Sequence, residues 1–129
     1  MAYPKDFKYT KEHEWVHATG KGKARVGITD YAQRQLGDIV FVELPEVGRE
    51  FEAGRPFGSV ESVKSVSELY APVSGKVAAI NGDLDSDPED VNADAHAAWM
   101  IELDLTKPAE LDDLLAAAEY EAYIAEESQ

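Results

Sequence analysis

Lys64 is the residue whose setting in this sequence most favours a chemical role. It lies at the centre of residues 58–75, where β-type residues lead into and out of a turn. Such a hairpin would present the Lys64 amine to solvent. Most lysines serve only as solvated surface charges, and an exposed, protonated lysine is a weak nucleophile. The pattern around Lys64 therefore predicts a site where an enzyme attaches an acyl group, and not a catalyst.

Two weaker patterns could suggest a metal site. Residues 83–87 begin like a calcium-binding loop with Asp94 at its twelfth position, but Pro88 replaces the glycine that the sixth position needs. His13 and His17 would point the same way on a strand, yet they are too far apart to chelate one ion readily. No metal site is predicted.

Composition limits the classes of function. The 129 residues suit one domain spanning 1–129, and 26 acidic against 12 basic residues give a net charge of −14. Nucleic-acid and anionic-membrane binding need clustered basic residues, so neither is expected. No run approaches the roughly 18 apolar residues of a membrane span, and nothing after Met1 resembles a signal peptide. The lack of cysteine permits a cytoplasmic location, and we expect a cytoplasmic monomer.

The negative charge is concentrated at one end of the chain. Residues 1–80 contain 11 acidic and 11 basic side chains, whereas residues 81–129 contain 15 acidic side chains and only Lys107. This surface could simply keep the protein soluble. It could also steer encounters with basic patches on partner proteins, and the two roles are compatible.

Short β segments dominate the first 80 residues. Residues 14–28 predict a hairpin with a five-residue loop at 19–23, and residues 38–44 predict a strand rich in Ile, Val and Phe. Between residues 50 and 80, closely spaced Gly and Pro separate further short strands. This spacing favours a small sandwich or barrel over a parallel α/β sheet.

One short helix interrupts these strands at residues 29–37. Asp30 followed by Gln33 fits a capping box, and Gly37 fits the left-handed residue that ends a helix. We therefore expect a mostly β fold with this helix near its N-terminus.

The last third of the sequence predicts a loop, a strand and helical structure. Residues 81–98 are expected to form a long surface loop, and residues 99–105 alternate as a half-buried strand does. Pro108 is suited to the first turn of a helix, and residues 120–127 are expected to continue helical and fray. The apolar residues expected on one helical stripe are Leu111, Leu114, Leu115 and Ala118.

Residues 61–64 and 69–75, Glu-Ser-Val-Lys and Leu-Tyr-Ala-Pro-Val-Ser-Gly, resemble the lipoylation hairpin of the glycine cleavage system H protein family. The resemblance extends over nearly the whole chain. Further matching segments, in the family's order, are residues 13–15, 27–33, 36–45 and 99–101.

The resemblance implies a barrel-sandwich hybrid, the fold of lipoyl and biotinyl carriers. Its core hairpin would span about residues 39–80, and a C-terminal helical extension would span about 108–127. The β pattern is compatible with this fold but does not establish it.

The neighbours of the lysine favour lipoate as the covalent cofactor on Lys64. Biotinyl carriers typically place Met on both sides of the modified lysine, whereas this chain has Val63 and Ser65. Glu61 precedes the lysine by three residues, as in lipoyl hairpins. Glu61 is therefore expected to be recognised by the enzyme that attaches the cofactor, a lipoate ligase or a lipoyl/octanoyl transferase.

The resemblance implies a carrier without catalytic activity and three partner enzymes. A pyridoxal-phosphate glycine decarboxylase (P protein) would load an aminomethyl group onto the lipoyl arm. A folate-dependent aminomethyltransferase (T protein) would remove it, and a dihydrolipoyl dehydrogenase (L protein) would reoxidise the dithiol. A tether raises the effective concentration of the arm at each active site within its reach.

The family also implies a cleft that protects the loaded arm. Its acidic positions match Glu14 and Glu68, with Glu12 nearby; the family often has Ser in place of Glu12 and Asp in place of Glu68. A carboxylate beside the aminomethyl nitrogen would keep it protonated and prevent loss of the thiolate. Residues 94–98 lack glycines and a proline that the family usually has, so we expect a reshaped loop there.

Three other functions share these features. A lipoyl-relay scaffold, which donates lipoyl groups to other proteins, would need the same Lys64. A biotinyl carrier would also modify it, and an interaction protein of this fold would leave it unmodified. Intact mass separates lipoyl, biotinyl and bare Lys64.

Overall fold

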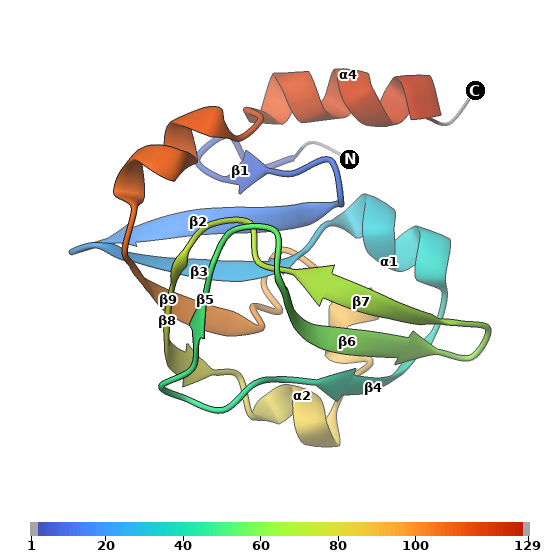
Figure 1. Ribbon diagram of the computed structural model, residues 1–129. Coiled ribbons are helices and arrows are strands. Elements are labelled where there is room, and N and C mark those ends of the chain that lie inside the picture. Colours follow the sequence, from blue (N-terminus) through green and yellow to red (C-terminus); the bar gives the residue numbers. More distant parts are fainter. Residues whose placement is uncertain (1–2, 128–129) are drawn as a thin grey trace.

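The computed structural model, which describes residues 3–127, contains two antiparallel sheets (Figure 1). The larger has six strands in the order β1 (Lys8–Tyr9), β2 (Glu14–Gly20), β3 (Lys23–Ile28), β9 (Ile101–Leu105), β8 (Gly75–Ile80) and β5 (Glu50–Phe51). The smaller has three strands in the order β4 (Ile39–Glu43), β6 (Pro56–Ser62) and β7 (Val66–Tyr70). The predicted mostly β class is confirmed.

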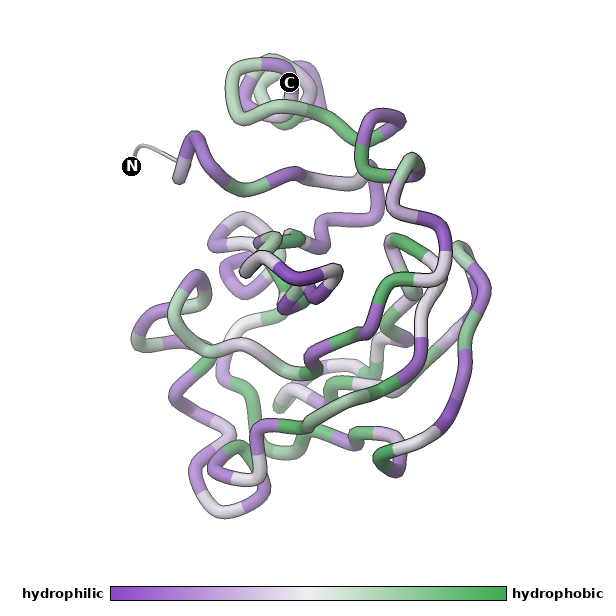
Figure 2. The backbone as a smooth tube through the Cα atoms, turned by 90° about the vertical axis from the view of Figure 1, so that its left-hand side faces the viewer, coloured by the Kyte–Doolittle hydropathy of each residue, from purple (hydrophilic) through white to green (hydrophobic). Residues whose placement is uncertain are grey.

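Short helices connect or cover these strands. They are α1 (Asp30–Leu36), α2 (Asp83–Ser86), α3 (Asp90–Ala93), the 3₁₀-helix η1 (Pro108–Asp113) and α4 (Ala117–Glu127). Helix α4 lies beside β1 at one end of the molecule (Figure 1), and Figure 2 shows it end-on above the N-terminal segment. None of the helices within residues 3–127 is long and apolar enough to cross a membrane.

Two groups of buried side chains form the core. The larger includes Val26 and Leu103 from the six-stranded sheet together with Val60 and Leu69 from the three-stranded sheet. The smaller is aromatic and joins the N-terminal segment, β2 and α4; it consists of Tyr3, Phe7, Tyr9, Trp15, Ala117 and Tyr120. Because each group draws on elements far apart in sequence, their burial fixes the tertiary arrangement.

The first hairpin is tighter than predicted. Strands β2 and β3 extend into the expected loop, so that only Lys21 and Gly22 remain between them. Both residues have positive φ, 57° and 74°, as a two-residue turn with φ > 0 at both positions requires. The sequence predicted a longer loop because residues 19–23 contain two glycines, two lysines and a threonine, and no apolar side chain that would indicate a strand.

Helix α1 is present, but the predicted role of Asp30 as its cap is wrong. The capping residue is Thr29, whose Oγ1 accepts a hydrogen bond from the Ala32 amide at 3.2 Å. The Asp30 side chain instead accepts from Gln33 Nε2 at 3.0 Å. Gly37 ends the helix with φ of 80°, as predicted.

The prediction of a long surface loop at residues 81–98 is also wrong. It forms the short helices α2 and α3, and its apolar side chains Leu84, Val91 and Ala98 join the larger core. Four-residue helices bury single residues rather than a continuous stripe, so periodicity could not reveal them.

The predicted helical stripe after Pro108 is broken. The segment begins as a 3₁₀-helix, and Leu114 then adopts extended backbone. Leu115 exchanges two backbone hydrogen bonds of 2.8 Å with Tyr9. Helix α4 extends to Glu127, as predicted for residues 120–127, and packs on β1 through the stacked rings of Tyr9 and Tyr120.

We predict that Gly58→Ala will destabilise the fold. A Cβ at Gly58 would overlap the backbone carbonyl oxygen of Glu43, and pushing β6 from β4 should cost about 1–3 kcal/mol in the free energy of unfolding. The measurement is urea unfolding. Gly82→Ala is the matched control, because Gly82 has φ of −62° and open space around it. Equal stability of the two variants would contradict this packing.

Candidate functional site

Lys64 lies at the tip of the hairpin formed by β6 and β7. Ser62 organises this tip: its amide donates to the Ser65 carbonyl at 2.8 Å, and its hydroxyl accepts from the Ser65 amide at 3.2 Å. The Val63 amide donates to the Asp38 carbonyl at 3.1 Å, which ties the tip to the start of β4. Lys64 is exposed and forms no ion pair with any residue in the range 3–127.

The end of α1 provides a firm base beneath the lysine. Lys64 Cε would lie 3.6 Å from a Cβ built on Gly37, so the lysine stem passes over this glycine. The Asn92 side chain donates to the Gly37 carbonyl and accepts from the Ile39 amide, both at 2.9 Å. The backbone under the tip is therefore held by α3, from the segment that was expected to be a loop.

Glu14 is a buried carboxylate at the start of β2, with 2% of its surface exposed. Thr10 Oγ1 donates to its Oε1 at 2.8 Å, and the Tyr70 amide donates to its Oε2 at 3.3 Å. Thr10 precedes β2 and Tyr70 ends β7, so this carboxyl joins the two sheets. Burial raises the pKa of Glu14 to about 7, although the hydrogen bonds from Thr10 and Tyr70 oppose the rise.

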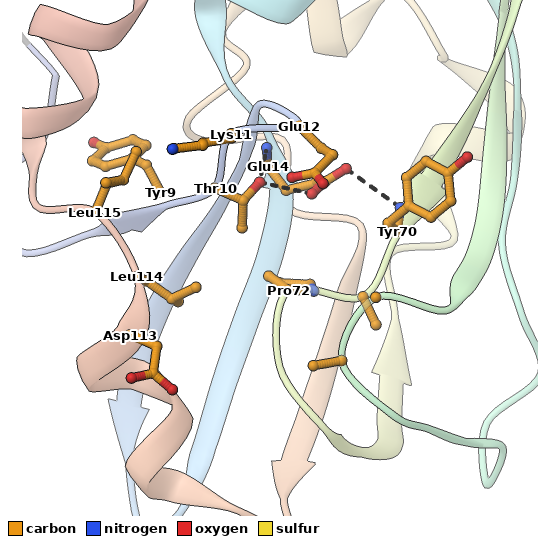
Figure 3. Close-up of a pocket in the computed structure, with 13 residues that line it drawn as sticks. Tyr9, Thr10, Lys11, Glu12, Glu14, Tyr70, Pro72, Asp113, Leu114 and Leu115 are labelled. Atoms are coloured by element: carbon orange, nitrogen blue, oxygen red, sulfur yellow. Dashed lines mark hydrogen bonds between the residues drawn. The ribbon is translucent and has the colours of Figure 1, made fainter.

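A cleft of about 450 Å³ opens beside Glu14 (Figure 3). Its walls come from the segment before β2, the turn before β6, the end of β7 and the chain after η1. The lining residues are Tyr9, Thr10, Lys11, Glu12, Glu14, Ala53, Gly54, Tyr70, Ala71, Pro72, Asp113, Leu114 and Leu115. Glu12 and Glu14 thus reach the same cleft, and a carboxyl that titrates near neutral pH lies in its wall.

Glu68 lies outside this lining. It is exposed on β7 and accepts a hydrogen bond from the Tyr70 hydroxyl at 3.3 Å. The negative charge of Glu68 is the largest cause of the raised pKa of Tyr70. Since the Tyr70 amide binds Glu14, Glu68 is linked to the cleft through Tyr70 rather than by lining it.

Sequence reasoning missed several parts of the cleft. Tyr70 was part of a matching motif, but nothing in the sequence gave it a role. Thr10 carries no recognisable pattern, and Leu114 and Leu115 were assigned to a helical stripe, because the three residues meet at the cleft only through tertiary packing. None of the divergent residues 94–98 lines the cleft. Trp15 Nε1 donates to the Ala95 carbonyl at 3.1 Å, so that loop serves the aromatic cluster.

No group of three or more His, Asp or Glu side chains that could hold a metal ion occurs in the described part of the chain. The residues with features suited to chemistry are therefore an exposed lysine at a fixed hairpin tip and a cleft with a buried carboxyl. The first could take an acyl group, and the second could hold a cation.

Residues 7–127 match the protein family described as glycine cleavage H-protein. The chain belongs to this family. It is 65% identical to the glycine cleavage system H protein of Koribacter versatilis over 99% of this chain and 98% of that protein. The corresponding protein of Acidobacterium capsulatum is 57% identical, also over 99% of this chain and 98% of that protein.

A solved structure supports both family and fold. The crystal structure of a glycine cleavage system H protein from Mycobacterium marinum matches with a TM-score of 0.87 and 41% sequence identity. The match covers 95% of this chain and 99% of that one. The barrel-sandwich fold predicted from the resemblance is thus confirmed. Proteins of the glycine cleavage H-protein family are the lipoyl carriers of the glycine cleavage system.

We predict that ionisation of Glu14 lowers the stability of this protein as pH rises. A carboxyl whose pKa is raised from 4.5 to about 7 by folding favours the native state fully below pH 4.5. That contribution is lost as pH rises through about 7, and the shift corresponds to about 3 kcal/mol. Urea unfolding at pH 5 and pH 8 measures it. Glu14→Gln should remove most of this difference, and an equal difference in wild type and Glu14→Gln would contradict it.

Proposed function

We propose that Lys64 carries a lipoyl group and that this chain moves the aminomethyl unit of glycine between enzymes without catalysing a step itself. The observation that carries the proposal is an exposed lysine, free of ion pairs with residues 3–127, at the tip of a hairpin held by its own backbone. The amide to lipoate would form at Lys64 Nζ. The bound dithiol supplies the chemistry, since its sulfur takes and releases the aminomethyl unit.

The residues present fit such a group. The tip is fixed by Ser62 and by the Val63–Asp38 backbone hydrogen bond, so the lysine is presented in one orientation. Its stem is flexible beyond that point, as a tether that visits several active sites requires. The hydrogen-bonded tip would fix the point of attachment for the enzyme that recognises it, and the flexible lipoyl-lysine would determine how far the dithiol can reach.

Glu14 would protect the aminomethyl nitrogen within the cleft. On a loaded arm, a free lone pair on this nitrogen would favour loss of the sulfur, and protonation would remove that lone pair. A buried carboxyl with pKa near 7 ionises readily once a cation lies beside it, because the ion pair offsets the desolvation penalty. The ionised Glu14 would then hold the proton on nitrogen, and the apolar lining residues Leu114 and Pro72 would limit access of water.

Glu12 and Glu68 would act from the edges of this site. Glu12 lines the cleft while exposed to solvent, so it adds negative potential at the entrance. Glu68 acts through Tyr70, whose hydroxyl it binds. The proposed role of each is to favour entry of a cation, with Glu14 making the closest contact.

The partners in this proposal are the glycine decarboxylase, the aminomethyltransferase and the dihydrolipoyl dehydrogenase. Each would meet a monomeric carrier in the cytoplasm, a location that the cysteine-free sequence permits. The acidic segment 81–129 supports rapid encounter with basic surfaces on these enzymes. Attachment itself requires a lipoate ligase or a lipoyl/octanoyl transferase, for which Glu61 is the proposed recognition residue.

Lys64→Arg should abolish lipoylation and leave the fold intact. Arginine keeps the charge at an exposed turn, where substitutions change stability by about 0.5 kcal/mol or less, but it offers no amine for the amide. Intact mass after incubation with lipoate ligase, lipoate and ATP is the measurement. Lys76→Arg, at another exposed lysine, should be lipoylated like wild type. Lipoate on any other lysine of Lys64→Arg would refute the assignment.

Glu14→Gln should shorten the lifetime of the aminomethyl adduct on fully lipoylated protein. The substitution removes the charge with little change of shape, so the nitrogen loses its proton more easily as pH rises above neutral. Release of formaldehyde and ammonia over time measures the lifetime, and we expect roughly a tenfold decrease, about 1.4 kcal/mol in the barrier. Glu46→Gln, an exposed position outside the cleft lining, is the control. Unchanged lifetimes in both Glu14→Gln and Glu68→Gln would exclude this role.

A further inference from the structure

The outer face of the three-stranded sheet carries exposed apolar side chains next to Lys64. Pairing of β4, β6 and β7 places Phe41, Glu61 and Val66 in one row across the sheet. Phe41 is 45% exposed and Val66 is 66% exposed, and Val63 at the tip is 69% exposed. Large apolar side chains gathered on an otherwise charged surface mark sites of interaction.

Carboxylates lie between and beside these apolar side chains, and they form no ion pair within residues 3–127. The next row across the same face is Glu43, Ser59 and Glu68. Together with Glu61, these rows contain three glutamates, and none of them forms an ion pair with residues 3–127. Apart from Lys64 itself, no basic side chain belongs to either row or to the tip.

The position of the reactive amine restricts which partner could use this face. Lys64 has only a four-carbon stem, so an enzyme that forms a bond at its Nζ must approach the tip to within side-chain contact. The three enzymes of glycine cleavage act on the far end of the lipoyl arm and can remain farther away. Contact with Val63 and Val66 is therefore unavoidable only for the acylating enzyme.

We infer that Phe41, Val63 and Val66, ringed by Glu43, Glu61 and Glu68, form the docking surface for the enzyme that acylates Lys64. This inference rests on the proposed function. The complementary surface on that enzyme is an apolar patch flanked by arginine or lysine side chains, because an unpaired carboxylate ring favours cations.

The surface serves one chemical step. The unprotonated Nζ of Lys64 attacks the carbonyl carbon of an activated acyl group, an adenylate or a thioester. The amide C–N bond forms as the acyl C–O bond of the adenylate or the C–S bond of the thioester breaks, which releases AMP or the thiol, and the proton lost by the nitrogen passes to the leaving group or to a base of the acylating enzyme. Docking through the sheet face holds Nζ in place for this attack without occupying the lysine itself.

Steady-state lipoylation of Phe41→Thr/Val66→Thr tests the apolar part. Threonine keeps the β-branched shape that suits a strand, and far-ultraviolet circular dichroism with thermal unfolding verifies the fold. With lipoate ligase, lipoate and ATP, the KM for the carrier should rise about tenfold while kcat is retained. Val47→Thr is the matched control, since Val47 is 60% exposed and follows β4 at the end opposite the tip. It should behave like wild type.

Charge reversal tests the carboxylate ring. Glu43→Lys should raise the same KM several-fold and weaken its dependence on salt, whereas Glu126→Lys on α4 should do neither. Once prolonged incubation has lipoylated Phe41→Thr/Val66→Thr fully, dihydrolipoyl dehydrogenase should act on it at the wild-type rate. A slower rate would overturn the assignment of this surface to the acylating enzyme.

These experiments distinguish failure of the docking surface from failure of the proposed lipoyl-carrier function. If the wild-type protein is lipoylated and the KM of Phe41→Thr/Val66→Thr is unchanged, the docking surface is overturned and the carrier role is retained. Wild-type protein that is never lipoylated at Lys64 would overturn the carrier role and the docking surface together.

Discussion

Burial of the Glu14 carboxyl between the two sheets is the constraint on which the cleft depends. Thr10 holds one of its oxygens from the segment before β2, and the Tyr70 amide holds the other from the end of β7. A charged group in this position is expensive unless these donors remain in place. The carboxyl is therefore both a bridge between sheets and a group whose ionisation responds to what enters the cleft.

The aromatic cluster holds the opposite wall of that cleft. The Tyr120 hydroxyl lies 2.7 Å from Thr29 Oγ1 and 2.8 Å from His13 Nδ1, so α4 is tied to the start of α1 and to the turn before β2. The Tyr9 and Tyr120 rings stack with centroids 4.8 Å apart. Because Leu115 pairs with Tyr9 just before α4 begins, this packing positions Leu114 and Leu115 at the cleft.

The sequence was informative where a local pattern has one physical meaning. Alternation predicted the strand at residues 99–105, β-type residues between Gly and Pro predicted the earlier strands, and Gly37 predicted the end of α1 because a left-handed residue is needed there. The motif around Lys64 predicted the hairpin tip and, through the family, its chemistry. The cap of α1 was misassigned because Thr29 and Asp30 are both good capping residues, and only the backbone decides between them.

Features that depend on contacts between distant segments could not be predicted in this way. Glu14 was identified from the family resemblance, yet its burial depends on Tyr70, 56 positions away. The break in the stripe after Pro108 arises because Leu115 pairs with Tyr9, and this pairing overrides helical periodicity. Likewise, the helices within 81–98 form because Leu84 and Val91 fill the larger core.

The place of β9 in the large sheet sets the order in which the molecule can be assembled during synthesis. Strand β9 lies between β3 and β8, so it joins the N-terminal strands to the rest of that sheet. A ribosome delivers residues in order, and Ile101–Leu105 emerge long after the hairpin that bears Lys64. The strands on either side of β9 thus keep open edges until β9 itself has been synthesised. A chain truncated before Ile101 therefore lacks the strand that joins β3 to β8 and cannot close the sheet.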